Sequence, residues 1–259
     1  MISSHHLAQH DTHVHSTYST DGRSNIHQIA EWGRHKLDCD ALWITDHLEF
    51  APQDQDFGVF NYEKIVEEIK QISRAFPKPS LFLGVEVDFQ SRFLEQIEEF
   101  LSSYEFDFVI GAVHYVNGRI DKEFYMKYGH RAYDAYFAEC LAAVNSGLID
   151  SLGHFNRPAG INPAVEFNRL EKMQAVLEAL LNEGVALELN TRHFERSDML
   201  EIMRMYTGIG GKMVTLGSDA HHASNIMLNF RKARALLARS SIEDLVIFAD
   251  RKAYSIPIC

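Results

Sequence analysis

Short apolar segments with the character of buried β-strands alternate with amphipathic helical segments along almost the whole chain. The apolar segment 214–216 is an example, and it is followed closely by two polar residues, Asp219 and His221. Strands that alternate with helices form parallel β-α-β units rather than an antiparallel sandwich. Parallel strands that close on themselves make a TIM-like barrel, and this is the α/β fold that we predict. An open, doubly wound parallel sheet is the alternative.

Hydrophobic periodicity divides the chain into strands, helices and loops. Seven strands are expected, at 9–16, 41–45, 81–85, 106–113, 149–153, 185–189 and 212–216. Helices are expected at 25–36, with Ser24 as N-cap, and at 62–76, 93–104, 131–146, 166–183, 197–206, 230–237 and 242–248, with an edge strand at 252–258. Two polar connections, 49–58 and 115–129, leave the carboxyl ends of strands, and such loops are natural lids over a substrate.

Composition limits the class of protein. The 259-residue chain is 46% hydrophobic and can bury one substantial core, so we expect a single domain spanning residues 1–259. The formal charge of −11 and the lack of a dense Lys/Arg block argue against nucleic acid as a partner. Three scattered cysteines support neither a disulfide framework nor a thiolate zinc site, and they fit a reducing compartment.

The same sequence offers no sign of export or membrane insertion. The first ten residues lack the basic start and apolar centre of a signal peptide. No apolar run approaches the roughly 18 residues of a membrane helix. We therefore expect a soluble cytoplasmic protein that acts on a small molecule, without membrane or nucleic acid as partner, and the sequence leaves the oligomeric state open.

Residue types that bind metal ions recur where the expected strands end. They are His13, His15, His47, Glu86, His114, His154, Asp219 and His221, with Asp21 in the turn after the first strand. A single histidine of this kind is usually a core residue with one hydrogen bond, but that interpretation is poor for six histidines at equivalent positions. The carboxyl ends of the strands of a parallel barrel gather at one face, so these side chains are expected to converge.

This set of donors points to metal ions and to more than one of them. Imidazole and carboxylate groups without thiolate suit zinc, iron, manganese or a similar divalent ion. The set contains more donors than one ion needs, so several ions are expected. Their positive charge also explains how so many acidic and polar groups tolerate burial in one pocket.

Short motifs around these residues resemble, in the same order along the chain, the motifs of the PHP (polymerase and histidinol phosphatase) superfamily. They are His13-x-His15 with Asp21-Gly22, Thr45-Asp46-His47, Gly84-Val85-Glu86, the strand ending at His114, Gly153-His154, and Gly217-Ser218-Asp219-Ala220-His221. The resemblance spans nearly the whole chain. It implies a distorted (βα)7 barrel of the PHP type with a trinuclear metal centre.

The resemblance also distributes the ligands over three divalent ions, which could be zinc, manganese or iron. The first ion would be held by His13, His15, Glu86 and Asp219, the second by Glu86, His114 and His154, and the third by Asp21, His47 and His221. Some members of the family have histidine in place of Asp21, so this position can tune which metal the third site prefers.

Paired ions a few ångström apart favour hydrolysis at phosphorus, because they activate a bridging water and stabilise the attacking and leaving oxygens. The expected nucleophile is a bridging hydroxide between the first two ions, so His13, His15, Glu86 and Asp219 would act in catalysis through the metals. A metal-dependent phosphoesterase is therefore the predicted function.

Candidates for substrate binding point to a phosphomonoester. Arg157 and Arg192 follow the fifth and sixth expected strands, and a planar guanidinium matches a terminal phosphate with two hydrogen bonds. Tyr115 and His193 are further candidates at the rim of the pocket. The chain resembles the stand-alone histidinol-phosphate phosphatases of the superfamily. This resemblance implies L-histidinol phosphate as substrate, in histidine biosynthesis.

Other functions fit part of the pattern. A phosphatase acting on a nucleotide or sugar phosphate would use the same site, whereas a nuclease or phosphodiesterase would need a basic groove. The complete ligand set argues against a metal-stabilised binding module with a degenerate site. An amidohydrolase-type barrel shares the His-x-His feature, but it commonly has a lysine after a middle strand, where this chain has Glu86 or His114.

Overall fold

A parallel β-sheet forms the centre of the protein. The computed structural model describes residues 9–258 except 117, 119–121, 156, 158–169, 193 and 195–198. The strands of the sheet are β1 (His10–Val14), β2 (Ala41–Ile44), β3 (His47–Leu48), β4 (Ser80–Asp88), β5 (Phe108–Ala112), β6 (Ser151–Leu152), β7 (Ala186–Asn190) and β8 (Val214–Gly217). They follow one another in the order β1-β2-β4-β5-β6-β7-β8, and the short β3 also pairs with β4. Every pairing in this sheet is parallel.

The sheet curves until its first and last strands meet. Val14 at the end of β1 forms a parallel bridge with Ala220, which follows β8. The His15 amide donates a hydrogen bond to the Ala220 carbonyl at 2.9 Å, and the Asp219 amide donates to the His13 carbonyl at 2.9 Å. The seam thus closes at the carboxyl ends of the strands. The predicted TIM-like barrel of distorted (βα)7 type is confirmed, and the open sheet is not observed.

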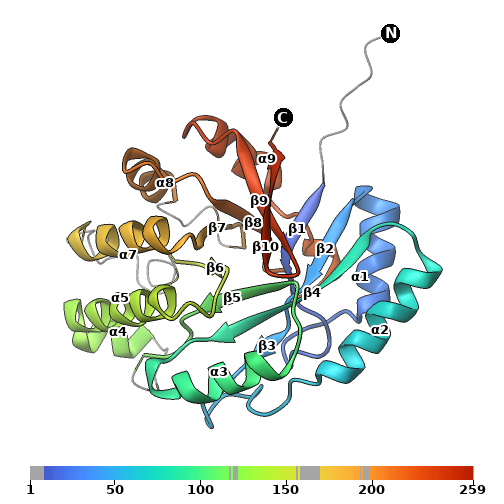
Figure 1. Ribbon diagram of the computed structural model, residues 1–259, viewed down its shortest axis with the longest axis horizontal. Helices are drawn as coiled ribbons and strands as arrows, with labels where there is room; N and C mark the ends of the chain where they lie inside the picture. The colour runs from blue at the N-terminus through green and yellow to red at the C-terminus, as the bar shows by residue number, and fades with distance from the viewer. Residues whose placement is uncertain are drawn as a thin grey trace.

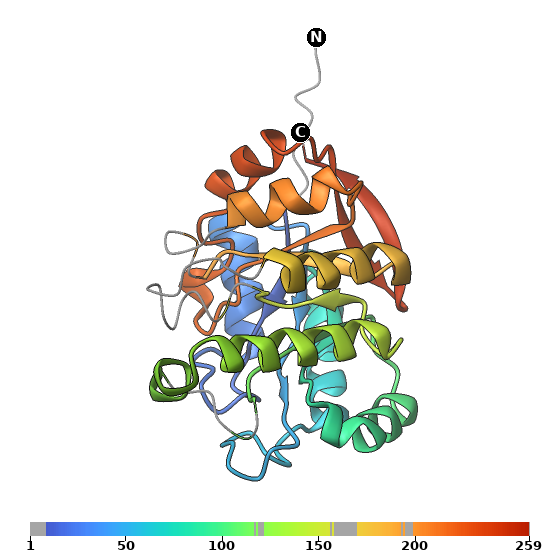
Figure 2. The same ribbon diagram turned by 90° about the vertical axis from the view of Figure 1, so that its left-hand side faces the viewer.

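Helices surround this barrel (Figure 1 and Figure 2). They are α1 (Ile26–Trp32), α2 (Tyr62–Ala75), α3 (Leu94–Ser103), α4 (Lys122–Tyr128), α5 (His130–Asn145), α7 (Leu170–Glu183), α8 (Met199–Gly208) and α9 (Phe230–Ala238). The apolar spacing explains their orientation: in α2 the residues Ile65, Ile69 and Ile72 share one face and are buried. The predicted beginnings of two helices, at 166 and 197, lie outside the described residues.

The start of α1 differs by one residue from the prediction. Asn25, not Ser24, is the N-cap: its side chain accepts a hydrogen bond from the Gln28 amide at 2.8 Å, and the Gln28 side chain accepts one from the Asn25 amide at 3.0 Å. This reciprocal pair is a capping box. Ser24 instead accepts a hydrogen bond from the Ala223 amide at 3.1 Å. Its hydroxyl therefore connects the α1 entry to the segment after β8.

The predicted helix at 242–248 is wrong, because this segment forms β9 (Asp244–Ala249). It pairs antiparallel with β10 (Lys252–Pro257), so the tail is the expected edge strand. Val246 and Phe248 are buried in a second apolar cluster with Trp43 and Phe108. A short apolar run does not distinguish strand from helix by periodicity, and this tertiary cluster decides the outcome.

The β9–β10 hairpin covers the amino-terminal end of the barrel (Figure 1). The Phe248 ring stacks on Phe108, the first residue of β5, with centroids 5.1 Å apart. The Trp43 indole N–H donates a hydrogen bond to the Phe248 carbonyl at 2.7 Å. This end of the molecule is therefore closed by packing, and the opposite end, where the strands terminate, is the one that carries functional groups in such barrels.

The connection at 115–129 is also more regular than predicted, because it contains α4. Phe124 and Tyr128, four residues apart, lie on the same side of the helix with ring centroids 5.1 Å apart. Phe124 is buried in the main core. The polarity of the segment concealed this apolar pair.

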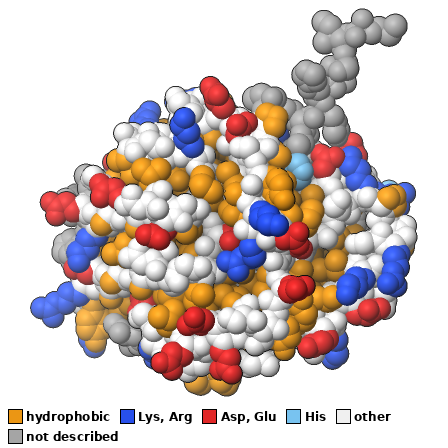
Figure 3. Space-filling model, viewed as in Figure 1, with side chains coloured by type: hydrophobic (Ala, Val, Ile, Leu, Met, Phe, Trp, Pro, Cys, Tyr) orange, Lys and Arg blue, Asp and Glu red, His pale blue; other side chains and the backbone are white. Residues whose placement is uncertain are grey.

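The surface seen from the side of the hairpin carries both signs of charge (Figure 3). Among the described side chains on this face, Lys and Arg are interspersed with Asp and Glu and do not gather into a continuous basic patch. None of the helices in the described residues is both long enough and apolar enough to span a bilayer.

Candidate metal centre

The predicted metal ligands converge at the carboxyl-terminal end of the barrel. His13 lies in β1, His47 in β3 and Glu86 in β4, whereas His15, His114, His154, Asp219 and His221 lie just beyond the ends of β1, β5, β6 and β8. His47 and Glu86 are direct partners in the β3–β4 ladder, so their side chains share one face of the sheet. The barrel thus brings together residues that are more than 200 positions apart, as the strand-end pattern predicts.

Glu86 is the centre of the cluster. Its side chain is only 1% exposed. Its oxygens lie close to ring nitrogens of five histidines: His154 at 2.8 Å, His47 at 3.0 Å, His15 at 3.4 Å, His13 at 3.5 Å and His114 at 3.5 Å. Oε1 faces the pair His114 and His154, and Oε2 faces His13, His15 and His47. One carboxylate therefore joins two groups of imidazoles.

Each of these two groups contains ring nitrogens that face one another. The Nε2 atoms of His13 and His15 are 3.0 Å apart, and Asp219 Oδ1 lies 3.5 Å from His15 Nε2. The Nε2 atoms of His114 and His154 are 3.3 Å apart. Such facing nitrogens with a carboxylate beside them are the donors that one ion can share.

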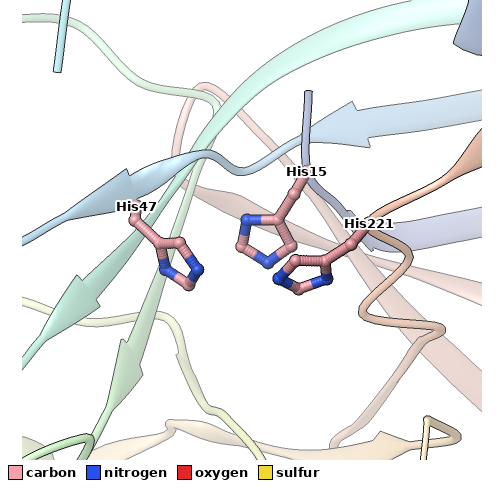
Figure 4. Close-up of side chains that lie close together, drawn as sticks. All are labelled: His15, His47 and His221. Carbon is pink, nitrogen blue, oxygen red and sulfur yellow. The ribbon is translucent and has the colours of Figure 1, made fainter. Parts of the chain in front are cut away.

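The third predicted group is more open to solvent. Asp21 Oδ2 lies 2.7 Å from His221 Nε2, and Asp21 Oδ1 lies 3.6 Å from His47 Nε2, while the Asp21 side chain is 47% exposed. Figure 4 shows His15, His47 and His221 directed toward one another from the segment after β1, from β3 and from the segment after β8. Donor atoms of these three histidines lie within 4.8 Å of one another. Asp56, which the sequence reasoning missed, can join Asp21 and His47 in the same way.

The pKa values differ among the imidazoles of the cluster, because burial lowers those of His15 and His154 whereas neighbouring carboxylates raise those of His13 and His47. Burial lowers the pKa of His13, but Glu188, Glu86 and Asp219 outweigh burial and hold that pKa well above its usual value. Burial likewise lowers the pKa of His47, and hydrogen bonds to Asp21 and Glu86 more than offset it. Burial raises the pKa of Glu86, but the neighbouring imidazoles bring it well below the usual range.

Two residues of the cluster have a backbone conformation that L-residues rarely adopt. The φ angle is 25° at His154 and 53° at Asp219. Such conformations cost about 1–3 kcal/mol each and tend to occur where a side chain must be aimed at a functional site. Both residues follow the end of a strand, and their side chains contact Glu86 and His15 of the cluster.

Two histidines of the cluster contact a glutamate through the ring nitrogen Nδ1, and these contacts show that the residues fit divalent cations. His13 Nδ1 lies 2.6 Å from Glu188 Oε1, and His114 Nδ1 lies 2.6 Å from Glu49 Oε1. The ionised Glu188 carboxylate only accepts hydrogen bonds, so His13 Nδ1 is the donor and, in the neutral ring, the His13 Nε2 lone pair faces the cluster. This carboxylate–histidine arrangement is typical of metal ligands.

Glu188 and Glu49 contact the cluster through His13 and His114, and the sequence reasoning missed both. Glu188 lies inside a predicted strand rather than at its end, and Glu49 begins a predicted loop. A charged residue inside the apolar run 185–189 was a signal that could have found Glu188. Glu49 lies two residues after His47. In an extended chain, side chains two residues apart point to the same side, so this spacing was a signal for Glu49.

The two predicted lid loops contact each other and the cluster. Besides Glu49, the loop 49–58 contributes Asp54, whose Oδ2 accepts a hydrogen bond from the Tyr115 hydroxyl at 2.6 Å. Gln53 donates a hydrogen bond to the Gly118 carbonyl at 3.3 Å. Both loops thus lie at the functional end of the barrel, and their opening and closing stays a prediction.

The candidate substrate-binding residues lie around the same cluster as far as they are described. Arg192 Nη1 is 2.9 Å from Asp219 Oδ1 and 3.0 Å from His221 Nδ1. The Arg157 amide donates a hydrogen bond to the His154 carbonyl at 2.7 Å, which places Arg157 beside the second group of imidazoles. His193 lies outside the described residues.

The raised pKa values of His13 and His47 predict how pH affects metal binding. The raised pKa values favour the protonated, charged form of both rings in the metal-free protein, and a metal ion can bind only after that additional proton leaves. We expect Zn²⁺ affinity to rise with pH, by up to about tenfold per pH unit for each proton released. Calorimetric titrations from about pH 6 to about pH 8, in buffers of different ionisation enthalpy, count these protons. Affinity that falls with rising pH would contradict the prediction.

Comparison with known proteins agrees with this fold and site. The PHP domain family profile matches residues 11–192, and the chain belongs to this family. It is 31% identical over 260 residues to the histidinol-phosphatase of Lactococcus lactis subsp. lactis strain IL1403, covering 93% of this chain and 95% of that protein. It is 29% identical over 254 residues to a Clostridium acetobutylicum protein named "Probable histidinol-phosphatase", covering 93% of this chain and 97% of that protein.

A solved structure supports the same relationship. The histidinol phosphate phosphatase of Lactococcus lactis, in complex with zinc, L-histidinol and phosphate, superposes with a TM-score of 0.87 at 28% sequence identity. The match covers 96% of this chain and 100% of that one. The resemblance that the sequence motifs indicate is therefore confirmed at the level of the family.

Proposed function

We propose that this protein is a metal-dependent phosphoric monoester hydrolase that converts L-histidinol phosphate into L-histidinol and phosphate, a step of histidine biosynthesis. The observation that carries the proposal is the close match, over 96% of the chain, to a phosphatase solved with zinc, L-histidinol and phosphate. The buried cluster around Glu86 supplies the donors that such an enzyme needs.

The ligand sets proposed for three divalent ions are those that the family resemblance implies. His13, His15, Glu86 and Asp219 would hold the first ion, Glu86, His114 and His154 the second, and Asp21, His47 and His221 the third. The opposite directions of the two Glu86 oxygens support a shared ligand between the first two ions. Divalent ions such as zinc, manganese or iron supply Lewis acidity there, which activates water and stabilises negative charge on the phosphoryl group.

The arginines are proposed to bind the phosphate. The Arg192 guanidinium is 39% exposed and reaches the edge of the cluster at Asp219, so it can contact a ligand there. Arg157 lies beside His154 on another strand end. Two guanidinium groups from different strands would orient a dianionic monoester through its terminal oxygens. Tyr115 completes the proposed rim through its contact with Asp54, and His193 is retained as a candidate on its sequence position.

The substrate assignment is tested by comparing catalytic efficiencies. The protein, purified with its metals retained, is assayed for phosphate release from L-histidinol phosphate, a nucleoside monophosphate, a sugar phosphate and one diester. We expect kcat/KM for L-histidinol phosphate to exceed the others several hundredfold, which corresponds to roughly 3 kcal/mol of transition-state binding. An E86Q protein prepared in parallel reports any contaminating phosphatase.

The other outcomes are equally informative. Comparable slow rates on all monoesters would retain the metal chemistry but reject L-histidinol phosphate as the cognate substrate. Cleavage of the diester alone would overturn the monoesterase proposal. A cytoplasmic location and a single domain over residues 1–259 stay predictions that this assay does not address.

A further inference from the structure

Glu188 occupies an unusual place for a charged residue. It lies in the middle of β7, between Leu187 and Leu189, and its side chain is fully buried in the barrel. A buried carboxylate is costly unless its oxygens accept hydrogen bonds. Its partners therefore indicate why this strand carries it.

Both carboxylate oxygens of Glu188 contact elements of the metal cluster. Oε1 lies 2.6 Å from His13 Nδ1, so it fixes the plane of that ring from behind. Oε2 accepts a hydrogen bond from the His154 backbone amide at 2.7 Å and one from the Asn190 side-chain amide at 3.1 Å. One side chain thus connects β7 with His13 in β1 and with the turn after β6.

The contact with His154 is at a strained point of the backbone. The φ angle of 25° at His154 requires surrounding contacts that hold it, and the hydrogen bond from its own amide to Glu188 is one of them. The same residue directs its Nε2 toward Glu86 at 2.8 Å. Glu188 therefore stabilises the turn that aims this ring.

Gly217 of the sequence motifs leaves the space that Glu188 occupies, and Gly153 leaves space for the neighbouring Ile110 side chain. A Cβ atom at Gly217 would lie 2.5 Å from Glu188 Oε1 and 2.5 Å from His13 Cβ. A Cβ atom at Gly153 would lie 2.7 Å from Ile110 and 3.5 Å from Glu188 Oε2. The interior of the barrel at this level is therefore shaped around the carboxylate and the ring that it holds.

We propose that Glu188 is a positioning residue of the metal centre, which orients His13 through its ring and His154 through its backbone and thereby increases the affinity of the centre for divalent ions. The inference rests on the proposed metal-dependent function. It differs from a purely structural role, in which the loss of Glu188 would reduce stability and leave metal affinity unchanged.

The test compares Glu188→Gln with Asp150→Asn as a matched control. Asp150 is a buried carboxylate at the amino end of β6, where it accepts hydrogen bonds from the Val109 amide at 2.8 Å and Arg251 Nε at 2.5 Å. Metal-stripped proteins, with folding checked by circular dichroism, are titrated with Zn²⁺ against a chromophoric chelator. We expect E188Q to bind Zn²⁺ about 10–100-fold more weakly than wild type, and D150N to bind it with wild-type affinity at a lower Tm.

The results separate the two proposals. Unchanged Zn²⁺ affinity and stoichiometry in folded E188Q would reject the positioning role while leaving the proposed function intact. Failure of the wild-type protein to bind any of Zn²⁺, Mn²⁺ and Fe²⁺ would overturn the proposed function and this inference with it.

A second measurement does not depend on the folding of a variant. Long-range ¹H–¹⁵N spectra of the zinc-loaded wild-type protein report the tautomer of each histidine. We expect His13 to carry its proton on Nδ1, because Glu188 accepts it there, and to present Nε2 to the metal. A His13 ring protonated on Nε2 would reject the inference.

Discussion

Replacement of Glu86 by glutamine is expected to lower kcat/KM by about 1000-fold or more, equal to roughly 4 kcal/mol of transition-state stabilisation. Glutamine has nearly the same shape, so the barrel can keep its packing. It loses the negative charge that lies within 3.5 Å of five imidazoles, and it replaces one carboxylate oxygen with an amide nitrogen, which only donates hydrogen bonds. The two groups of histidines then lack the anion that they share.

The measurement compares steady-state kinetics and metal content of the E86Q protein with those of an E98Q control. Glu98 is an exposed residue of α3, and its replacement removes the same charge far from the cluster. We expect E98Q to behave as wild type. Wild-type kcat/KM and full metal content in E86Q would show that Glu86 is not a shared ligand.

The strand-end residues of the site were predictable from the sequence, because topology alone places them. His47, Glu86 and His114 follow or end apolar runs, and parallel strands in a barrel deliver such positions to one face whatever the details of packing. The grouping of the donors around Glu86 depends on β-strand register. Only the ladder that pairs His47 directly with Glu86 reveals it.

The two glutamates that contact Nδ1 of the cluster histidines were not predictable in the same way. Glu188 and His13 are 175 positions apart, and Glu49 and His114 are 65 apart, so each hydrogen bond requires the closed barrel. Glu188 lies inside β7 rather than at its end, and Glu49 directly follows β3, a two-residue strand that the sequence did not predict. A charged residue in an apolar run marks a buried partner without identifying it.

The fold shows the same division between local and tertiary information. The apolar spacing of α2 has one interpretation, whereas the run that forms β9 can pack as either a strand or a helix. Val246 and Phe248 become strand residues because they fill the amino end of the barrel against Trp43. The positive φ angles at His154 and Asp219 are likewise imposed by the site rather than by local preference.

Removal of the metal ions is expected to abolish phosphatase activity and to lower thermal stability. His13, His15 and Glu86 are buried with little or no exposure in the fold. Divalent cations would therefore bind far more tightly to the folded cluster than to an unfolded chain. Ligand binding of this kind stabilises a fold by about 2.7 kcal/mol when the free ligand is at 100 times its Kd. Prolonged chelation followed by gel filtration should leave less than about 1% of the activity, and added Zn²⁺ or Mn²⁺ should restore it.

Measuring both phosphatase activity and Tm makes this test decisive for the role of the metals. Catalytic ions alone would change activity with little change in Tm, whereas ions that also neutralise the buried carboxylates Glu86 and Asp219 must change both. Because imidazoles surround these carboxylates, the metal-free protein retains some compensation, and we expect it to stay folded with a lower Tm. Full activity in protein shown by elemental analysis to be metal-free would refute metal-dependent hydrolysis at this site.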